Sequence, residues 1–498
     1  MRQTISMDEF LDADDFADNR SASAKPKEKN DKNPFYQQDL AKKFLEENGH
    51  PVCTYQGNHL VYDDGRYREE KHLPMKLRQL LLRNKVPHNN TLVGNVIPHI
   101  EAMTFLDGQD HPSLPFWRGK EYAKPQNVIA YRNGLADVER ILDGDHTLLP
   151  HTPEWVSLIR LPFDYDPGAT CPKWLSFLEE TLEGDQDRIR LLQEFMGYGL
   201  LPDPTRQKLL VLKGLPRSGK GTVARVFGRL LGDENSTGFS LTALAERFGI
   251  GSLVGKLAAF VGEVNLQKCN DKYTILERLN SIVGCDPVEV EYKHNPHKSS
   301  VILPVRFVIS CNEFPNFADT SGALASRLLL VDFEKSVPEE ERDPGLTEKL
   351  CTELPGINNW ALKGLERLNE HGFTMPAKTK DSIQRIRRES SSTYAFLQDC
   401  LIINKELDTG NLPGIATTTD EVSTTADDLK SSFMSWANDN DTRDSAEWLG
   451  RNLRTLLPKL DRKKVKLGDG RVWGYPGIAI QPGMKGKTIL NTWGDKKS

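Results

Sequence analysis

Short apolar runs alternate with helix-compatible stretches through the middle of the chain, between about residues 200 and 335. The alternation predicts an α/β core on a largely parallel sheet, because strands separated by helices usually pair in parallel. The runs expected to form buried strands are 209–212, 257–261, 306–310 and 328–333. Apolar residues recur at helical spacing over 223–231, 346–354 and 357–371.

The segment before this core has a different pattern. Residues 1 to about 35 are polar and mixed in charge, and we expect them to be a disordered tail. A helix is predicted over 39–48, and a hairpin with a tight turn at Asp63-Asp64-Gly65 follows. A strand enters a turn over 128–134, and one or two helices broken at Gly184-Asp185 span 174–196. Residues 36–195 are therefore expected to form an α+β module ahead of the core at 196–375.

After Met375 the composition changes again. Basic residues crowd a helix-like segment at 378–388, and a Thr/Asp-rich stretch at 408–426 is expected to be a linker. Two helical patterns (427–438 and 445–459) and a ribbon over 465–473 are typical of a winged helix. The last fifty residues hold 12 Lys/Arg against 3 Asp, although the whole chain carries a net charge of -5. This asymmetry favours a nucleic-acid-binding domain over 376–498, although a solvated basic tail is compatible with it too.

Composition excludes several other classes of protein. A chain of 498 residues is too long for one core, so two to four domains are expected. No apolar run approaches the roughly 20 residues of a membrane span, and the acidic N-terminus lacks the pattern of a signal peptide. The seven cysteines are scattered, without the spacing of a zinc site or a disulfide framework. We expect a cytoplasmic protein without a membrane partner.

The most informative motif connects the first core strand to the helix that follows it. Small residues in such a loop let backbone N–H groups close around a polyphosphate, while Lys220 reaches the outer phosphates. A glycine-rich connection with a solvated lysine is the alternative. The loop departs from the usual phosphate-binding pattern at one position: Gly221 stands where a residue with a hydroxyl group normally follows the lysine. The loop comprises Gly214, Leu215, Pro216, Arg217, Ser218, Gly219, Lys220, Gly221 and Thr222.

Hydrolysis of a bound nucleoside triphosphate needs further groups, and three candidates lie near strand ends. Glu263 could organise a metal and water, Asn312 could hold the water against the γ-phosphate, and Arg327 could reach a neighbouring subunit's nucleotide. Each has a simpler reading. Glu263 is compatible with a solvated carboxylate and Asn312 with a turn. Arg327 is compatible with a surface ion pair to Asp332 or Glu334.

Taken in order, these residues resemble the ATPase of superfamily 3 helicases, found in primase–helicase proteins of phages, plasmids and poxviruses. The resemblance covers roughly residues 125 to 480. Its lead-in and later motifs are Arg132-Asn-Gly134, Leu149-Pro-His-Thr-Pro153, Pro162-Phe-Asp-Tyr-Asp-Pro-Gly-Ala169, Cys171-Pro-Lys-Trp174 and the helix 356–365. It implies a P-loop, AAA+-like core in a ring, expected to be a homo-hexamer.

The resemblance also implies roles for individual residues. The phosphate loop becomes the first motif, Glu263 the Walker B acid, Asn312 the sensor and Arg327 the arginine finger. The family places a DNA-contacting β-hairpin between its second and third motifs. Here that position makes Lys293, His294 and Lys298 candidates for phosphate contacts, or for a solvated turn.

The expected ligands are ATP and Mg²⁺, with Thr222 and Glu263 as metal-binding candidates. Thr222 or a water would replace the hydroxyl missing at Gly221, and Gly262 stands where many members have a second carboxylate. The expected partners are single-stranded and origin DNA, and a primase or polymerase in trans. No primase module is recognisable before residue 125, so we expect a helicase without primer synthesis.

Two other functions use the same loop. A nucleoside monophosphate kinase also displays a loop ending in Gly-Thr, but it places the loop near its N-terminus. A nucleotide-gated replication initiator with little unwinding would keep the ATPase core and the C-terminal DNA-binding domain. DNA-stimulated ATP hydrolysis is expected of the helicase, whereas phosphorylation of AMP at the expense of ATP is expected of the kinase.

Overall fold

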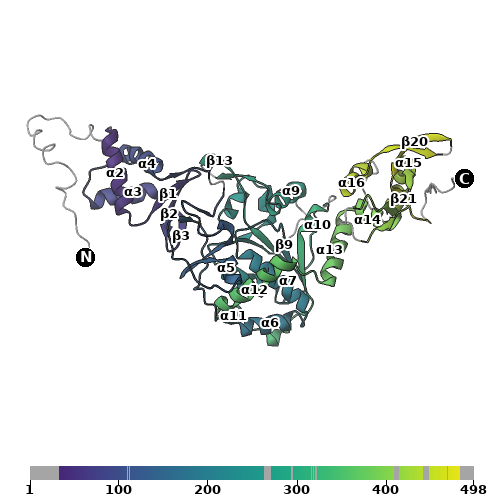
Figure 1. The fold of residues 1–498 in the computed structure, drawn as a ribbon, viewed down its shortest axis with the longest axis horizontal. Coiled ribbons are helices and arrows are strands. Elements are labelled where there is room, and N and C mark those ends of the chain that lie inside the picture. The colour runs from purple at the N-terminus through teal and green to yellow at the C-terminus, as the bar shows by residue number, and fades with distance from the viewer. Residues whose placement is uncertain are drawn as a thin grey trace, which may run out of the picture. The chain divides into compact units, whose positions relative to one another are not determined.

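The computed structural model describes residues 33–482, except 109, 111–112, 263–270, 293–294, 316, 318, 320–321, 409–413, 441–447 and 468. The chain divides into two compact units, Met1–Tyr165 and Asp166–Ser498 (Figure 1). The four-part division expected from the sequence stays a prediction. No helix among the described residues is long and apolar enough to cross a bilayer.

The first unit combines four described α-helices with small sheets. The predicted hairpin is confirmed: Asp64 and Gly65 have φ angles of 53° and 81°, as a two-residue hairpin turn requires. Residues 75–125, whose pattern is mixed, hold two helices and two short strands. The helices are α2 (Pro34–Glu47), α3 (Leu73–Arg83), α4 (Asn90–Thr104) and α5 (Val138–Leu142). The strands are β1 (Val52–Tyr55), β2 (Asn58–Asp63), β3 (Arg66–Glu69), β4 (Phe105–Leu106), β5 (Phe116–Trp117), β6 (Val128–Tyr131), β7 (Gly134–Asp137) and β8 (Trp155–Val156).

The second unit is built on a five-stranded parallel sheet, which confirms the α/β prediction. All four predicted strands belong to it. The fifth, β10, is a polar edge strand, and its Ser-Thr-Gly-Phe sequence lacks the apolar run that marks the others. In spatial order the strands are β10 (Ser236–Phe239), β11 (Ala258–Val261), β14 (Arg306–Cys311), β9 (Leu209–Gly214) and β15 (Leu328–Phe333).

Helices before, between and after these strands pack around the sheet. The helical pattern over 174–196 is broken in two, because Glu183 and Gly184 adopt positive φ angles of 54° and 70°. The helix expected over 346–354 stops at Cys351, and Pro355 occupies the first turn of the next helix. The helices are α6 (Pro172–Thr181), α7 (Gln186–Gly199), α8 (Lys220–Leu231), α9 (Lys272–Val283), α10 (Ala323–Arg327), α11 (Leu346–Cys351), α12 (Leu354–His371) and α13 (Ala377–Ser390).

The C-terminal part of this unit has its own core cluster. The two predicted helices and the ribbon are present there. The stretch expected to be a linker also holds two strands, whose threonines favour extended backbone. The elements are α14 (Ser392–Cys400), β16 (Leu401–Asn404), β17 (Ala416–Thr418), β18 (Ser423–Thr425), α15 (Ala426–Asp439), α16 (Leu449–Leu456), β19 (Lys463–Leu467), β20 (Gly470–Pro476) and β21 (Ile478–Ile480). They form the sheets β17-β16-β21 and β18-β20-β19.

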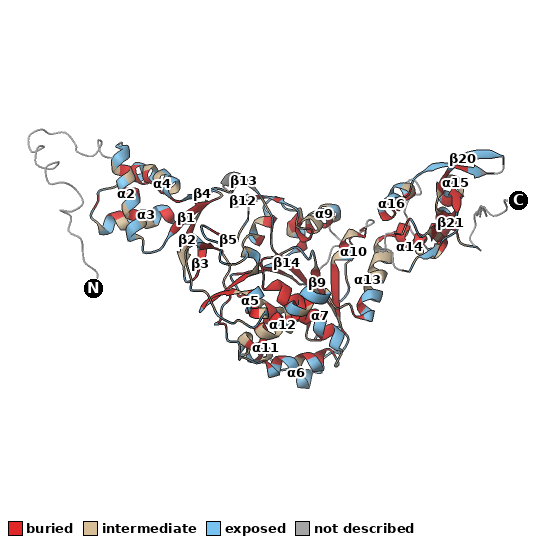
Figure 2. Cartoon of the chain, viewed as in Figure 1, coloured by how far each residue is buried: buried red, intermediate tan, exposed pale blue. Residues whose placement is uncertain are grey.

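The closest helix contact of the second unit joins α7 and α12, and α7 is largely buried (Figure 2). The two backbones meet at glycines. A Cβ on Gly197 would lie 2.3 Å from the Ala361 carbonyl oxygen, and one on Gly364 would lie 2.5 Å from the Gln193 backbone. Any larger residue at either position must push the helices apart.

We predict that Gly197→Ala lowers the free energy of unfolding by about 1–3 kcal/mol, because the added methyl overpacks a backbone contact. Urea unfolding of the full chain measures it. The matched control is Gly94→Ala in helix α4, where a Cβ would meet nothing within 4 Å. That substitution should leave stability unchanged or raise it slightly. Equal stability of the Gly197→Ala and wild-type proteins would contradict the proposed contact.

Candidate functional site

The phosphate-type loop lies where the sequence predicts, between the end of β9 and the start of α8. Two of its glycines are required by close contacts. Gly214 has a φ of 147°, and a Cβ there would lie 2.0 Å from the Phe333 carbonyl oxygen. Gly219 has a φ of 90°, and a Cβ there would lie 2.7 Å from Thr181 Cγ2 of helix α6. The loop is therefore held between the end of β15 and α6.

Further backbone bonds fix the loop to the segment after β15. The Leu215 N–H donates to the Phe333 carbonyl over 3.2 Å. The Val337 N–H donates to the Arg217 carbonyl over 3.0 Å, and Arg217 has a positive φ of 61°. These bonds fix the position of the loop backbone relative to the segment after β15.

Lys220 folds back over the loop. Its Nζ donates to the Gly214 and Leu215 carbonyls, over 2.7 and 2.5 Å, and to Ser218 Oγ over 3.3 Å. Burial lowers the pKa of Lys220 below its ordinary value of 10.5. The partners of the ammonium group are thus neutral oxygens, and an anionic ligand would be a stronger partner for it.

The sheet brings Asn312 to the same place. Its Oδ1 lies 3.5 Å from Lys220 Nζ, because β14 and β9 are parallel neighbours and their carboxyl ends meet. Strand β11, the next neighbour of β14, ends at Val261 on that same edge. Glu263 follows two residues later and lies outside the described residues. Two of the predicted residues, Lys220 and Asn312, therefore lie together.

Arg327 lies at the opposite edge of the sheet. It ends α10, and Leu328 then opens β15 opposite Leu209, at the amino ends of the strands. The six residues of β9 span about 17–20 Å, which separates Arg327 from the loop of its own chain. Its Nη1 donates to Asn280 Oδ1 over 2.8 Å.

The simpler reading of Arg327, a surface ion pair with Asp332 or Glu334, is wrong for the described structure. Asp332 lies 3.9 Å from Lys213, and Glu334 lies 2.7 Å from Lys378. Both carboxylates are at the carboxyl end of β15 or beyond it, one strand length away from Arg327.

A cavity of about 1010 Å³ opens beside the loop. Thr222 lines it, and its hydroxyl accepts a bond from the Arg225 guanidinium over 3.2 Å. Residues of α6 and of the segment after β15 complete the walls, and nothing in their sequence pattern marks them as site residues. These unpredicted lining residues are Pro172, Lys173, Ser176, Phe177, Glu180, Thr181, Val337, Glu341, Arg342, Asp343, Pro344, Leu346 and Thr347.

The predicted hairpin is formed by β12 (Val288–Tyr292) and β13 (Asn295–Val301), which pair antiparallel. Lys298 lies opposite Glu291 in this register. Lys293 and His294, expected at the tip, lie outside the described residues, and so does the side chain of Lys298. Their predicted role in DNA contact stays a prediction.

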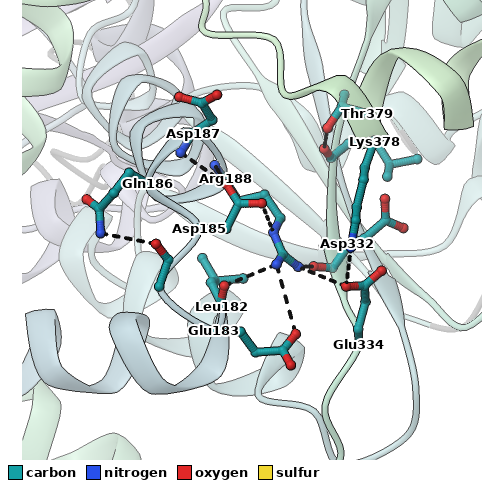
Figure 3. Close-up of polar contacts among 12 residues, drawn as sticks. Leu182, Glu183, Asp185, Gln186, Asp187, Arg188, Asp332, Glu334, Lys378 and Thr379 are labelled. Carbon is teal, nitrogen blue, oxygen red and sulfur yellow. Dashed lines mark hydrogen bonds and ion pairs between the residues drawn. The ribbon is translucent and has the colours of Figure 1, made fainter.

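One buried arginine connects the loop's support to two helices (Figure 3). The Arg188 side chain of α7 is 4% exposed. It donates to the Asp332 carbonyl over 2.7 Å, to the Leu182 carbonyl over 3.1 Å and to Asp185 Oδ2 over 2.9 Å. Asp332 directly precedes Phe333, the residue against which the loop is held. Arg188 thus fixes the end of β15 and, through it, the position of the loop.

Helix α13 joins the same strand end. Thr379 Oγ1 donates to the Leu330 carbonyl over 2.6 Å, and Lys378 Nζ donates to Glu334 over 2.7 Å (Figure 3). Helix α7 before the sheet, strand β15 within it and helix α13 after it therefore meet near the end of β15.

The ionisation of Asp185 reports on the Arg188 contact. Burial acts to raise the pKa of Asp185, but hydrogen bonds from the backbone and guanidinium of Arg188 outweigh it and hold the pKa below 3.8. A carboxyl with a depressed pKa stabilises the fold above its unfolded pKa, and this contribution is lost as pH falls through the folded value.

We predict that Arg188→Ala lowers the free energy of unfolding by about 3 kcal/mol at pH 7, because it leaves buried carbonyls and a carboxylate without their donor. The difference in the free energy of unfolding between the wild type and Arg188→Ala should shrink below about pH 4, where Asp185 is protonated in the unfolded state of both proteins. Arg190→Ala is the matched control: its side chain, on the same helix, is 52% exposed and pairs with Asp187 over 3.4 Å. Such a surface pair contributes at most about 1 kcal/mol. Equal effects of the two substitutions in urea unfolding would contradict the role of Arg188.

Part of the second unit is similar to a protein family whose function is not known. Residues 212–327 match the model of a family of unknown function, DUF5906, and this stretch contains Lys220, Glu263, Asn312 and Arg327. Apo structures of the NrS-1 C-terminal region align with 88% of this chain and 98% of theirs, at 11–12% identity and TM-scores of 0.47–0.49.

Proposed function

We propose that the chain is an ATP-dependent DNA helicase of the superfamily 3 type, acting as a ring. The observation that carries the proposal is the separation of Lys220 and Asn312, at the carboxyl edge of the sheet, from Arg327 at its amino edge. A site divided in this way is complete only when a second copy supplies the arginine. ATP at an interface between subunits is the arrangement that such a division suits.

The order of the sheet supports an AAA+-like P-loop core. Strand β9, which leads into the loop, lies between β14, which carries Asn312, and β15, which follows Arg327. Strand β11, followed by Glu263, lies on the far side of β14. Lys220 and Asn312 thus follow neighbouring strands and lie together, which supports the proposed assignment.

Each residue has a defined task in this proposal. Lys220 exchanges its carbonyl partners for the outer phosphates of ATP, while loop N–H groups bind the remaining oxygens. Asn312 holds the attacking water beside the γ-phosphate, and Glu263 accepts its proton. Arg327 of the neighbouring copy stabilises the charge that develops on the phosphoryl group.

Mg²⁺ bound with the nucleotide would supply charge neutralisation of the β- and γ-phosphates. Groups of three His, Cys, Asp or Glu side chains that could hold a metal are absent among the described residues. The metal would be held by phosphate oxygens of the nucleotide together with Thr222 and Glu263. Thr222 lines the cavity and fits this role once its hydroxyl leaves Arg225.

The β12–β13 hairpin and the C-terminal part provide the proposed DNA contacts. The hairpin would move along one strand inside a homo-hexameric ring, and a winged-helix-like domain would bind origin DNA. A primase or polymerase would act in trans in the cytoplasm of the host cell. A replication initiator with little unwinding is the second candidate, favoured by the separate basic domain at the C-terminus.

The test of the proposal is ATP hydrolysis with and without single-stranded DNA, together with unwinding of a forked duplex. We predict that single-stranded DNA raises the hydrolysis rate and that ATP drives unwinding. Lys220→Ala should lower hydrolysis by at least about 100-fold, because the preorganised charge on the transferred phosphoryl group is lost. DNA-stimulated hydrolysis without unwinding would support the initiator, and phosphorylation of AMP would support a monophosphate kinase. Either result would overturn the helicase.

The origin of the arginine is tested by mixing two inactive variants. Arg327→Ala subunits retain the loop, and Lys220→Ala subunits retain the arginine, so each preparation alone should bind DNA but turn over little ATP. Mixed before assembly, they should recover up to about a quarter of wild-type hydrolysis, because about one interface in four pairs an intact loop with an intact arginine. No recovery, or normal turnover by Arg327→Ala alone, would refute an arginine acting in trans.

A further inference from the structure

One face of the β19–β20 ribbon gathers cations around an exposed indole. In the antiparallel register Lys464 lies opposite Trp473, and Lys466 lies opposite Arg471. Opposite residues share a face, and residues two apart in a strand share it too. The named face therefore consists of Lys464, Lys466, Arg471 and Trp473, all four of which are exposed. We call it the ribbon face.

The side chain of Trp473 lies outside the packed part of the C-terminal domain. Tyr475, two residues further along the same face, is 7% exposed and is covered by α16, where a Cβ on Gly450 would touch its hydroxyl. Trp473 extends beyond that helix and is 53% exposed. Figure 2 shows exposed residues along the outer part of β20, whose first four residues are all exposed except the half-buried Val472. The indole thus contributes little to the core while offering a large flat surface to an external partner.

The cationic groups of the ribbon face are also available to bind a ligand. Within the part of the chain that the structure describes, no ion pair occupies Lys464, Lys466 or Arg471. The guanidinium of Arg462 lies 5.5 Å from the Trp473 ring centroid, which adds a fourth cation beside the indole. On the opposite face of the same strand, by contrast, Lys463 is paired with Asp461 over 3.1 Å.

We propose that the ribbon face binds single-stranded DNA, with an unpaired base stacked on Trp473 and backbone phosphates on Lys464, Lys466 and Arg471. Cations at regular spacing fit a polyanion, and an exposed aromatic ring among them fits a base that is free of its partner. A duplex satisfies the cations but leaves the indole uncovered. The choice of DNA rests on the proposed function, whereas the charge and the ring are properties of the ribbon itself.

The test uses the full chain without nucleotide, so that it does not depend on ATP hydrolysis. An oligothymidylate carrying 5-iodouracil is irradiated with the protein, and the crosslinked peptides are identified by mass spectrometry. The expected result is a crosslink at Trp473. Crosslinks confined to the 288–301 hairpin would overturn the proposal, even if DNA-stimulated hydrolysis established the helicase.

Binding titrations of the labelled oligothymidylate give the second measurement. Trp473→Ala should weaken binding by about 5- to 100-fold, since stacking on one base is lost, and Trp473→Phe should retain most of the affinity. Each of Lys464→Ala, Lys466→Ala and Arg471→Ala should reduce the salt dependence of log K by about 0.7.

Two controls match these variants. Lys463→Ala removes a cation from the same strand but from the opposite face. Tyr122→Ala removes an exposed aromatic ring, 52% exposed with Lys120 above it at 5.3 Å, from the first unit. Both should leave affinity unchanged. Wild-type affinity of the Trp473→Ala protein for the oligothymidylate would overturn the assignment. So would an equal loss of affinity for a blunt duplex, or for single-stranded RNA, as for single-stranded DNA.

Discussion

The candidate site depends on one close approach between two backbones, where the ends of β9 and β15 meet. Gly214 lies against the Phe333 carbonyl with no room for a side chain, and the Leu215 N–H donates to that same oxygen. The end of β15 therefore determines where the loop lies. Arg188 holds that end through the Asp332 carbonyl one residue earlier, from a nearly fully buried position. A charged side chain from a preceding helix thus sets the geometry of a loop that it does not touch.

The polarity of the parallel sheet accounts for the division of the proposed catalytic groups. All carboxyl ends lie on one edge, so the loop, Asn312 and the position before Glu263 meet there. Arg327 precedes its strand and must lie on the other edge. The parallel direction of the strands thus brings most of the proposed site together within one chain. The same strand direction keeps Arg327 away from it. A requirement for a second copy would follow from strand direction alone, without any special contact.

The C-terminal part has a different relation between core and surface. Its helices bury leucines and aromatic residues in a cluster of their own, to which the ribbon contributes Tyr475. Exposed cations and an indole on such a ribbon cost the domain little stability.

Much of the fold follows from local patterns. The four apolar strands, the two-residue turn at Asp64-Gly65 and the loop at Gly214–Thr222 are contiguous in sequence, and each depends on backbone conformations that neighbouring residues decide. The break at Gly184-Asp185 was predicted, whereas the polar edge strand β10 was missed and the helix expected over 346–354 ends at Cys351, because pairing partners and packing override weak local preference. The placement of Lys220 near Asn312 was predictable only after the strands were known to be parallel neighbours.

Other features were decided by tertiary structure alone. Arg188 meets the carbonyl of a residue 144 positions away, and α6 meets the loop through Thr181 and Gly219. No spacing or composition marks such contacts, since they depend on how distant elements pack. The ribbon face is similar: its lysines were visible as a basic end, but only the register places them around Trp473. The sequence by itself determined which chemical groups the chain carries and in which local conformations. The tertiary structure decided which of them meet, because strand direction, register and close packing act between residues that the sequence keeps apart.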